Sequence, residues 1–258
     1  MLQVARIPAG EFAMGAEDGD EDERPVHKAY LDEFAMGVYP VTNAEYAQFV
    51  IETGHPSPAI RRLPLIVSGA LESEFRALSA GYFWNSGTPP EGRANQPVTL
   101  ITIDDAIGYC TWLAGKTGEA VRLPTEAEWE KAARGGADGR NYPWGDSLDP
   151  ARAHFLVESA QKADRGTAAV GSYPPNGYGL FDMSGNVWEW VADWYAPRYY
   201  ERAQYVNPKG ADSGVMRLVR GGACVNAHGK YLRCSYRHKV PPDSYAYSIG
   251  FRIAYSVR

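Results

Sequence analysis

The amino-acid sequence predicts an α+β fold that is rich in loops and has little regular secondary structure. Its 258 residues include 27 Gly and 18 Pro, which favour turns, beside 17 Tyr and 7 Trp. A disordered chain would show the glycine and proline without the large aromatic side chains, so we expect irregular segments held in place by buried rings. We find neither a linker nor a repeat, and residues 1–258 are therefore predicted to form a single domain.

Three segments predict helices because each begins with a capping box, in which a hydroxyl residue is followed three positions later by a carboxylate. The first helix begins after Thr42 and ends at Gly54, the second begins after Thr102, and the third begins after Thr125 and ends at a pair of glycines. Apolar residues recur at helical spacing in the second segment, and Cys110 lies on that stripe. We therefore interpret Cys110 as a core thiol.

The remaining regions predict loops and short strands. Residues 54–95 are rich in proline and glycine but also contain large apolar side chains, which favours an ordered excursion over a linker. After Tyr142, short apolar runs alternate with turn sequences such as PPNG and SGN, which is typical of short strands.

Composition excludes several classes of function. The 26 Lys and Arg against 31 Asp and Glu give a net charge of −5, which argues against a nucleic-acid partner. Three cysteines are too few for a disulfide scaffold, and no apolar run approaches the ~20 residues of a membrane helix. The first residues lack the basic and apolar regions of a secretory signal, so we expect a cytoplasmic protein without a membrane partner.

A series of motifs resembles the formylglycine-generating enzyme, or sulfatase-modifying factor, family. In chain order these are IPAGEFAMG (7–15), PVTNAEY (40–46), RLPTEAEWE (122–130), YPWG (142–145), PPNGYGL (174–180), GNVWEW (185–190), RGG (220–222) and GFR (250–252). They span nearly the whole chain. The resemblance implies a single domain of the C-type-lectin superfold, in agreement with the loop-rich composition.

The resemblance does not extend to the catalytic cysteines. Family members that make formylglycine have two cysteines a few residues apart after the RGG segment, and these thiolates bind copper. Here Cys224 lies too near the glycines and Cys234 lies beyond Arg233, so the enzymes' cysteine positions hold other residues. The serine that usually follows RGG is Ala223. We therefore predict that this protein does not generate formylglycine.

The same region contains a second candidate set of metal ligands. Cys224, His228, Cys234 and His238 have residue types that bind zinc or copper if their side chains converge. Their spacing is not that of a zinc finger, and the alternative is that they decorate an irregular loop. We treat copper or zinc as the less favoured cofactor.

The resemblance implies one calcium site. Matching the family's motif residue by residue gives Asp182 and Glu189 as carboxylate ligands, with the backbone carbonyls of Gly185 and Val187. The alternative is that both carboxylates only cap turns. The family's second calcium site is degraded here, because His154 and Lys162 take the places of its ligands.

Two further features favour structural interpretations. The acidic run at residues 17–23 lacks the glycine and glutamate of a calcium-binding loop, so we expect a solvated loop. The aromatic residues of 188–200 are expected to belong mostly to the core.

These observations favour a non-catalytic binding domain whose C-terminal segment, residues 223–248, forms a recognition surface for a protein or small-molecule ligand. Arg233, Arg237 and residues 249–252 match the family and are expected to form its frame, while the intervening residues are mixed. Tyrosine provides a large contact area at low entropic cost. We expect ligand contacts and exposed side chains at eight positions, Val225, Asn226, His228, Tyr231, Tyr236, His238, Tyr245 and Tyr247.

The mixed composition also resembles the variable region of proteins diversified by retroelements. Most of these residue types are reachable from AAC codons by changing adenines only, although Lys230 and Lys239 are not. Two alternatives remain open. One is an oxidase or oxygenase that uses the Cys224, His228, Cys234 and His238 set, and the other is an accessory factor that matures a partner protein.

Overall fold

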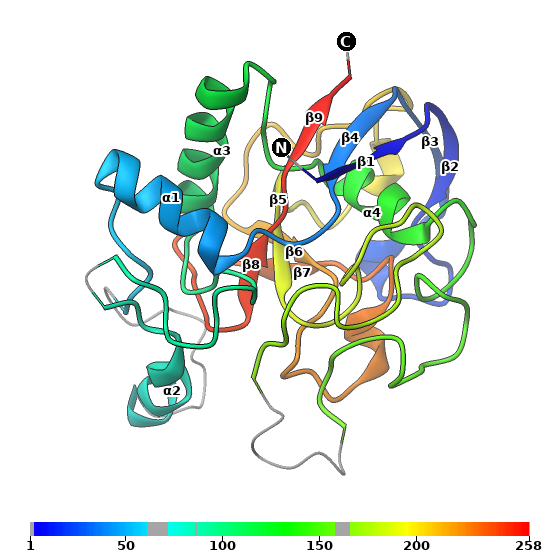
Figure 1. Ribbon diagram of the computed structural model, residues 1–258. Helices are drawn as coiled ribbons and strands as arrows, with labels where there is room; N and C mark the ends of the chain where they lie inside the picture. Colours follow the sequence, from blue (N-terminus) through cyan, green and yellow to red (C-terminus); the bar gives the residue numbers. More distant parts are fainter. Residues whose placement is uncertain (1–2, 61–71, 86, 158–165, 258) are drawn as a thin grey trace.

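Three small β-sheets form the strand framework (Figure 1). The structure is a computed structural model and describes residues 3–60, 72–85, 87–157 and 166–257. The first sheet has the strand order β1-β4-β9, the second pairs β2 with β3, and the third has the order β7-β6-β5-β8. The strands are β1 (Val4–Ile7), β2 (Gly10–Met14), β3 (His27–Leu31), β4 (Phe34–Gly37), β5 (Trp188–Trp194), β6 (Arg217–Arg220), β7 (His238–Val240), β8 (Ile249–Phe251) and β9 (Ala254–Ser256).

The third sheet places the C-terminal segment. Strand β5 lies between β6, which runs antiparallel to it, and β8, which runs parallel to it. Most of the side chains of β5 are buried, including those of Trp188 and Trp190. The C-terminal segment leaves the end of β6, forms β7 on the outer edge and returns as β8 beside β5. Its two ends are therefore fixed by one sheet.

The three predicted helices are confirmed, together with their caps. Helix α1 (Asn43–Thr53), helix α3 (Ile103–Thr117) and helix α4 (Glu126–Arg134) each begin with the predicted capping box and end at a glycine in the left-handed conformation. The short helix α2 (Glu72–Ser79) was not predicted. It lies within the predicted excursion at residues 54–95, of which 61–71 and 86 fall outside the described residues. Short 3-10 helices complete the fold at η1 (Glu21–Glu23), η2 (Ala80–Tyr82), η4 (Tyr200–Arg202) and η5 (Gly229–Leu232).

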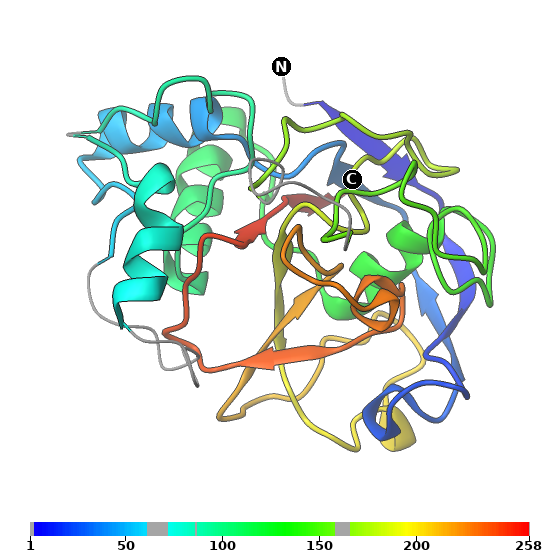
Figure 2. The ribbon, with the colours of Figure 1, turned by 90° about the horizontal axis from the view of Figure 1, so that it is seen from below.

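Two apolar clusters hold the layers together. Figure 2 shows α1, α2 and α3 on one side of the central strands, and α4 with the N-terminal strands on the other. Side chains of α1 and α3, with Trp188, Trp190 and Phe251, form the first cluster, and Cys110 is buried in it as predicted. Trp129 of α4 lies in the second cluster with side chains of β2, β3 and β4. No helix among the described residues is long and apolar enough to cross a membrane.

A third cluster contradicts part of the predicted surface. Tyr245 is only 3% exposed and packs with Phe75, Tyr82 and Leu100, while Tyr247 packs against the same cluster. Phe75 belongs to α2, so these tyrosines hold the excursion against the C-terminal segment. The absence of an apolar period around Tyr245 misled the sequence prediction, because its packing partners lie more than a hundred residues away in the chain.

Candidate binding site

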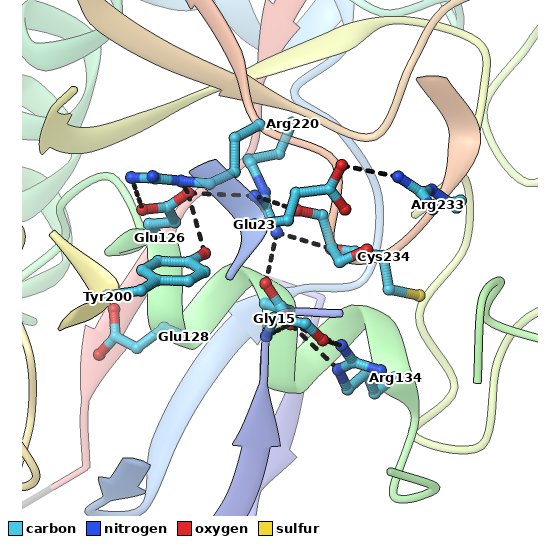
Figure 3. Close-up of polar contacts among 12 residues, drawn as sticks. Gly15, Glu23, Glu126, Glu128, Arg134, Tyr200, Arg220, Arg233 and Cys234 are labelled. Atoms are coloured by element: carbon cyan, nitrogen blue, oxygen red, sulfur yellow. Dashed lines mark hydrogen bonds and ion pairs between the residues drawn. The ribbon is translucent and has the colours of Figure 1, made fainter. Parts of the chain in front are cut away.

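A buried network of charged side chains forms the frame under the C-terminal segment (Figure 3). The Arg220 guanidinium donates to Glu126 at 3.0 Å and to Glu130 at 2.7 Å, and both carboxylates lie on α4. The same group donates to the backbone carbonyls of Ser235 and Cys234 at 3.0 and 2.6 Å. Buried charges are stable only when they are paired and hydrogen-bonded. This pairing therefore anchors the C-terminal segment to α4.

Arg237 extends the same network toward the N-terminus. Its Nε and one terminal nitrogen donate to the Glu126 carboxylate at 2.7 and 3.0 Å, and the other terminal nitrogen donates to the Asp22 carbonyl at 2.8 Å. Its guanidinium lies 4.4 Å from the centre of the Tyr200 ring. Arg237 is therefore a frame residue, as the sequence predicted.

The acidic loop, residues 17–23, is attached to the C-terminal segment. The expectation of a solvated loop holds for Glu17, Asp18 and Asp20, which are exposed, but Glu23 is completely buried. Its carboxylate accepts a hydrogen bond from Arg233 at 2.6 Å, some 210 residues along the chain. A carboxylate can be buried at such a position because the arginine compensates its charge. The sequence prediction missed this partner because it compared only neighbouring residues.

Four side chains form an aromatic cluster, which we define as Trp188, Tyr231, Tyr236 and His238. The His238 ring stacks on Trp188 with 4.7 Å between centroids, and Tyr236 lies 6.0 Å from Trp188. Tyr231 meets Tyr236 edge to face at 5.1 Å and an interplanar angle of 86°. Three of the eight predicted ligand contacts thus gather around a tryptophan from β5. Tyr236 is only 9% exposed and belongs to the first apolar cluster together with Trp188, so the prediction of an exposed side chain is wrong at this position, as it is at Tyr245. Exposed His228 lies next to them, 6.3 Å from Tyr231.

An open groove of about 1240 Å³ passes along this cluster. Its lining comes from the acidic loop with Arg24 and Pro25, from residues 195–201, and from residues 236–239, which include Tyr236 and His238. Burial and the neighbouring Lys239 ammonium lower the pKa of His238 to about 4. His238 therefore presents an uncharged ring to the groove at neutral pH.

The other predicted contacts have structural roles. The Asn226 side chain accepts a hydrogen bond from the Ala223 amide at 2.8 Å and closes the turn after the RGG motif. Val225 is half-buried and packs against the first apolar cluster. Gly222 permits this turn, since it has φ of +75° and a Cβ there would lie 2.8 Å from the Tyr231 carbonyl. Asn226 and Val225 therefore support the loop that carries His228.

The cysteine and histidine set does not converge. Cys224 and Cys234 are buried, whereas His228 is exposed, and no group of three or more His, Cys, Asp or Glu among the described residues is placed to hold a metal. Burial raises the pKa of both thiols to about 12, so neither is a thiolate at neutral pH. The described side chains therefore give no support to an oxidase built on these four residues.

The residues of the implied calcium site fit a hard cation in part. Asp182 is 9% exposed, and burial raises its pKa to about 6, which a nearby cation would reverse. The Glu189 carboxylate already accepts bonds from Arg252 at 2.6 and 2.7 Å and from the Trp129 indole at 2.7 Å. The Asp182 carboxylate accepts a hydrogen bond from the Gly171 amide at 2.8 Å, so it is less engaged than the Glu189 carboxylate and is the better candidate ligand for calcium. Of the degraded second site, Lys162 lies outside the described residues.

Comparisons with known proteins agree with this architecture. A family model described as a sulfatase-modifying factor enzyme 1-like domain matches residues 2–257. The formylglycine-generating enzyme of Streptomyces coelicolor is 38% identical over 281 residues, which cover 96% of this chain and 88% of the relative. The mouse (Mus musculus) protein named inactive C-alpha-formylglycine-generating enzyme 2 is 32% identical, over 98% of this chain and 85% of the relative.

Solved structures show the same fold. The structure of PvdO from Pseudomonas aeruginosa matches with a TM-score of 0.78 and 28% identity, over 98% of this chain and 94% of that one. Treponema denticola variable protein 1 matches with a TM-score of 0.74 and 22% identity, over 98% and 95%, which shows the fold alone. The predicted α+β, loop-rich fold and the predicted family are confirmed.

Proposed function

The chain belongs to the family of sulfatase-modifying factor enzyme 1-like domains, and from this premise we propose that it is a binding member that makes no formylglycine. It recognises a protein or small-molecule ligand through the C-terminal segment. The observation that carries the proposal is the aromatic cluster at the groove. Its three members come from the C-terminal segment, in which Arg233 and Arg237 are fixed in the frame.

The state of the cysteines supports a function other than the oxidation of a substrate cysteine to formylglycine. Copper binding by a pair of thiolates requires accessible, deprotonated sulfur. Cys110, Cys224 and Cys234 are each buried, and burial raises the pKa of each to about 12. Similarity to an inactive mouse relative is compatible with this interpretation.

A narrower form of the proposal is that the recognition surface is diversified by a retroelement. The residue types of the C-terminal segment support it, and so does the alternation of frame arginines with aromatic side chains at a groove. Sequencing the adjacent DNA tests this form. We expect a reverse-transcriptase gene and a near-copy of the segment's coding sequence, and their absence would contradict it.

We also propose that the fold binds one calcium ion at Asp182, with the carbonyls of Gly185 and Val187 and the remaining lone pairs of Glu189. The buried Asp182 carboxyl is adjacent to Arg252 and Glu189, whose charges act on it in opposite directions. Calcium would supply positive charge to this carboxylate and would stabilise the loop that leads into β5. Its role here is structural.

Peptide display tests the binding function. Random peptides are selected on the wild-type protein and then tested on a His228→Ala/Tyr231→Ala variant and on a Val215→Ser control. Val215 is 85% exposed and belongs neither to an apolar cluster nor to the groove. Melting curves establish that both variants are folded. We expect most selected peptides to lose binding to the double variant and to keep binding to the control. Peptides that bind all three proteins equally would refute the proposal.

A further inference from the structure

The aromatic cluster already holds a cation of the chain itself. The Lys230 ammonium lies 5.3 Å from the centre of the Tyr231 ring and 5.7 Å from that of Tyr236. Because these two rings stand nearly perpendicular to each other, they form a corner that the ammonium approaches from two sides. An ammonium within about 6 Å of an aromatic ring is attracted by the negative face of the ring.

Carboxylates stand beside this corner. The Asp20 carboxylate lies 3.6 Å from the Lys230 ammonium, and about half of each side chain is exposed. Burial raises the pKa of Tyr236, and the neighbouring Tyr231 and the carboxylates of Asp20, Asp22 and Glu23 raise it further, so several carboxylates lie near this ring. Exposed Glu17 and Glu21 line the same groove, as do the basic side chains of Arg24, Arg198, Arg237 and Lys239. At the corner itself the Asp20 carboxylate attracts a cation from solution.

The rest of the cluster offers no positive charge to oppose a cation. His238 is uncharged at neutral pH because burial and Lys239 lower its pKa to about 4. Lys239 is engaged elsewhere, with its ammonium 3.0 Å from the Tyr195 hydroxyl and 3.9 Å from Asp22. Lys230 is therefore the cation that occupies the corner, and the two ring contacts and one exposed ion pair with Asp20 hold it there. The exposed pair contributes little, and an incoming cation would regain the ring contacts, so Lys230 can be displaced.

We propose that Tyr231 and Tyr236 form a receptor site for the ammonium or guanidinium of a lysine or arginine side chain from a protein partner, which enters by displacing Lys230. This inference rests on the binding function proposed above and adds the chemical class of the ligand. The acidic loop supplies the charge complement for a basic segment lying in the groove, and the aromatic corner supplies the ring faces.

Choline and 3,3-dimethylbutan-1-ol form a suitable pair of probes, because they have the same shape and differ in charge. Both are titrated at low salt, with NMR detection, into the wild-type protein and a Lys230→Met variant. We expect choline to bind more tightly than the alcohol. Removing the resident ammonium should strengthen choline binding by about 2- to 30-fold, the range of a cation–π contact from exposed to desolvated sites. Equal binding of the two probes to Lys230→Met would overturn the inference.

Two further variants locate the effect. Tyr236→Leu in the Lys230→Met background should remove the preference for choline. If melting curves show that Tyr236→Leu is unfolded, Tyr231→Leu is tested in its place. Lys116→Met is the matched control, since the Lys116 ammonium lies 5.0 Å from the Trp112 ring in a separate part of the fold. It should leave choline binding unchanged. A choline preference that survives both tyrosine substitutions would refute the assignment.

The display experiment separates this inference from the proposed function. Peptides that depend on His228 and Tyr231 and are enriched in lysine or arginine support both. Surface-dependent peptides without such enrichment would refute the cation site and leave the binding function intact. If no selected peptide depends on the surface, the proposed function fails, and the choline titration still decides whether the corner binds cations.

Discussion

Replacing Arg220 with methionine should destabilise the fold strongly. The Arg220 side chain is completely buried and donates four hydrogen bonds, two to the carboxylates of Glu126 and Glu130 and two to the carbonyls of Ser235 and Cys234. Methionine fills similar space but leaves those acceptors without their donor. Breaking a buried ion pair in this way costs about 3–5 kcal/mol.

The expected change in melting temperature follows from the size of the chain. An unfolding entropy of about 2.1 cal/mol/K per residue gives about 0.5 kcal/mol/K for 258 residues, so 3–5 kcal/mol corresponds to a decrease of about 6–10 °C. Calorimetry at a fixed calcium concentration measures this decrease in melting temperature. The melting temperature of Arg220→Lys should lie between those of the wild type and Arg220→Met, because an ammonium keeps the charge but cannot reproduce the planar fork of the guanidinium.

The control is Arg6→Met, since the Arg6 side chain is 71% exposed and pairs with Glu33 at the surface. Exposed pairs contribute about 0–1 kcal/mol, so this variant should melt within about 2 °C of the wild type. If Arg220→Met also melted within 2 °C of the wild type, the buried network would not be the anchor of the C-terminal segment.

Four further predictions concern chemistry, calcium, pH and the surface. Mass spectrometry of a cysteine-containing sulfatase peptide incubated with the protein and copper should show no aldehyde product. An aldehyde product would contradict the prediction that this protein does not generate formylglycine. Calcium at a hundredfold excess over its Kd should add about 2.7 kcal/mol to the free energy of unfolding, and Asp182→Ala should abolish that increment. If chelator leaves the melting curve of the wild-type protein unchanged, the calcium site is excluded. In chelator, the raised pKa of Asp182 predicts that stability falls as pH rises from 3.8 to about 6, because the unfolded carboxyl loses its proton first, and Asp182→Asn should remove that fall. His228→Ala should leave the melting temperature unchanged, whereas Tyr245→Ala should cost about 3 kcal/mol, and similar melting of the two variants would contradict the assigned burial.

Local signals account for what was predicted well. The capping boxes at Thr42, Thr102 and Thr125 act within one helical turn, so each helix could be placed from a few neighbouring residues. Cys110 was assigned to the core from helical spacing alone. Helix α2 was missed because it lies in a stretch whose prolines and glycines are typical of loops, and its Phe75 is buried against distant partners.

The sequence by itself determined the family, the loop-rich fold class and the frame arginines of the C-terminal segment, because motifs and caps are read from adjacent residues. Only the tertiary structure decided which aromatic side chains face the groove. Tyr236 and Tyr245 each follow a serine in the chain, but Tyr236 contacts Trp188 of β5 while Tyr245 packs against Phe75 of α2. The contact of Glu23 with Arg233 joins residues 210 positions apart. Such pairs depend on how the strands are ordered in the sheets, and that order is set by the packing of the whole core rather than by any local pattern.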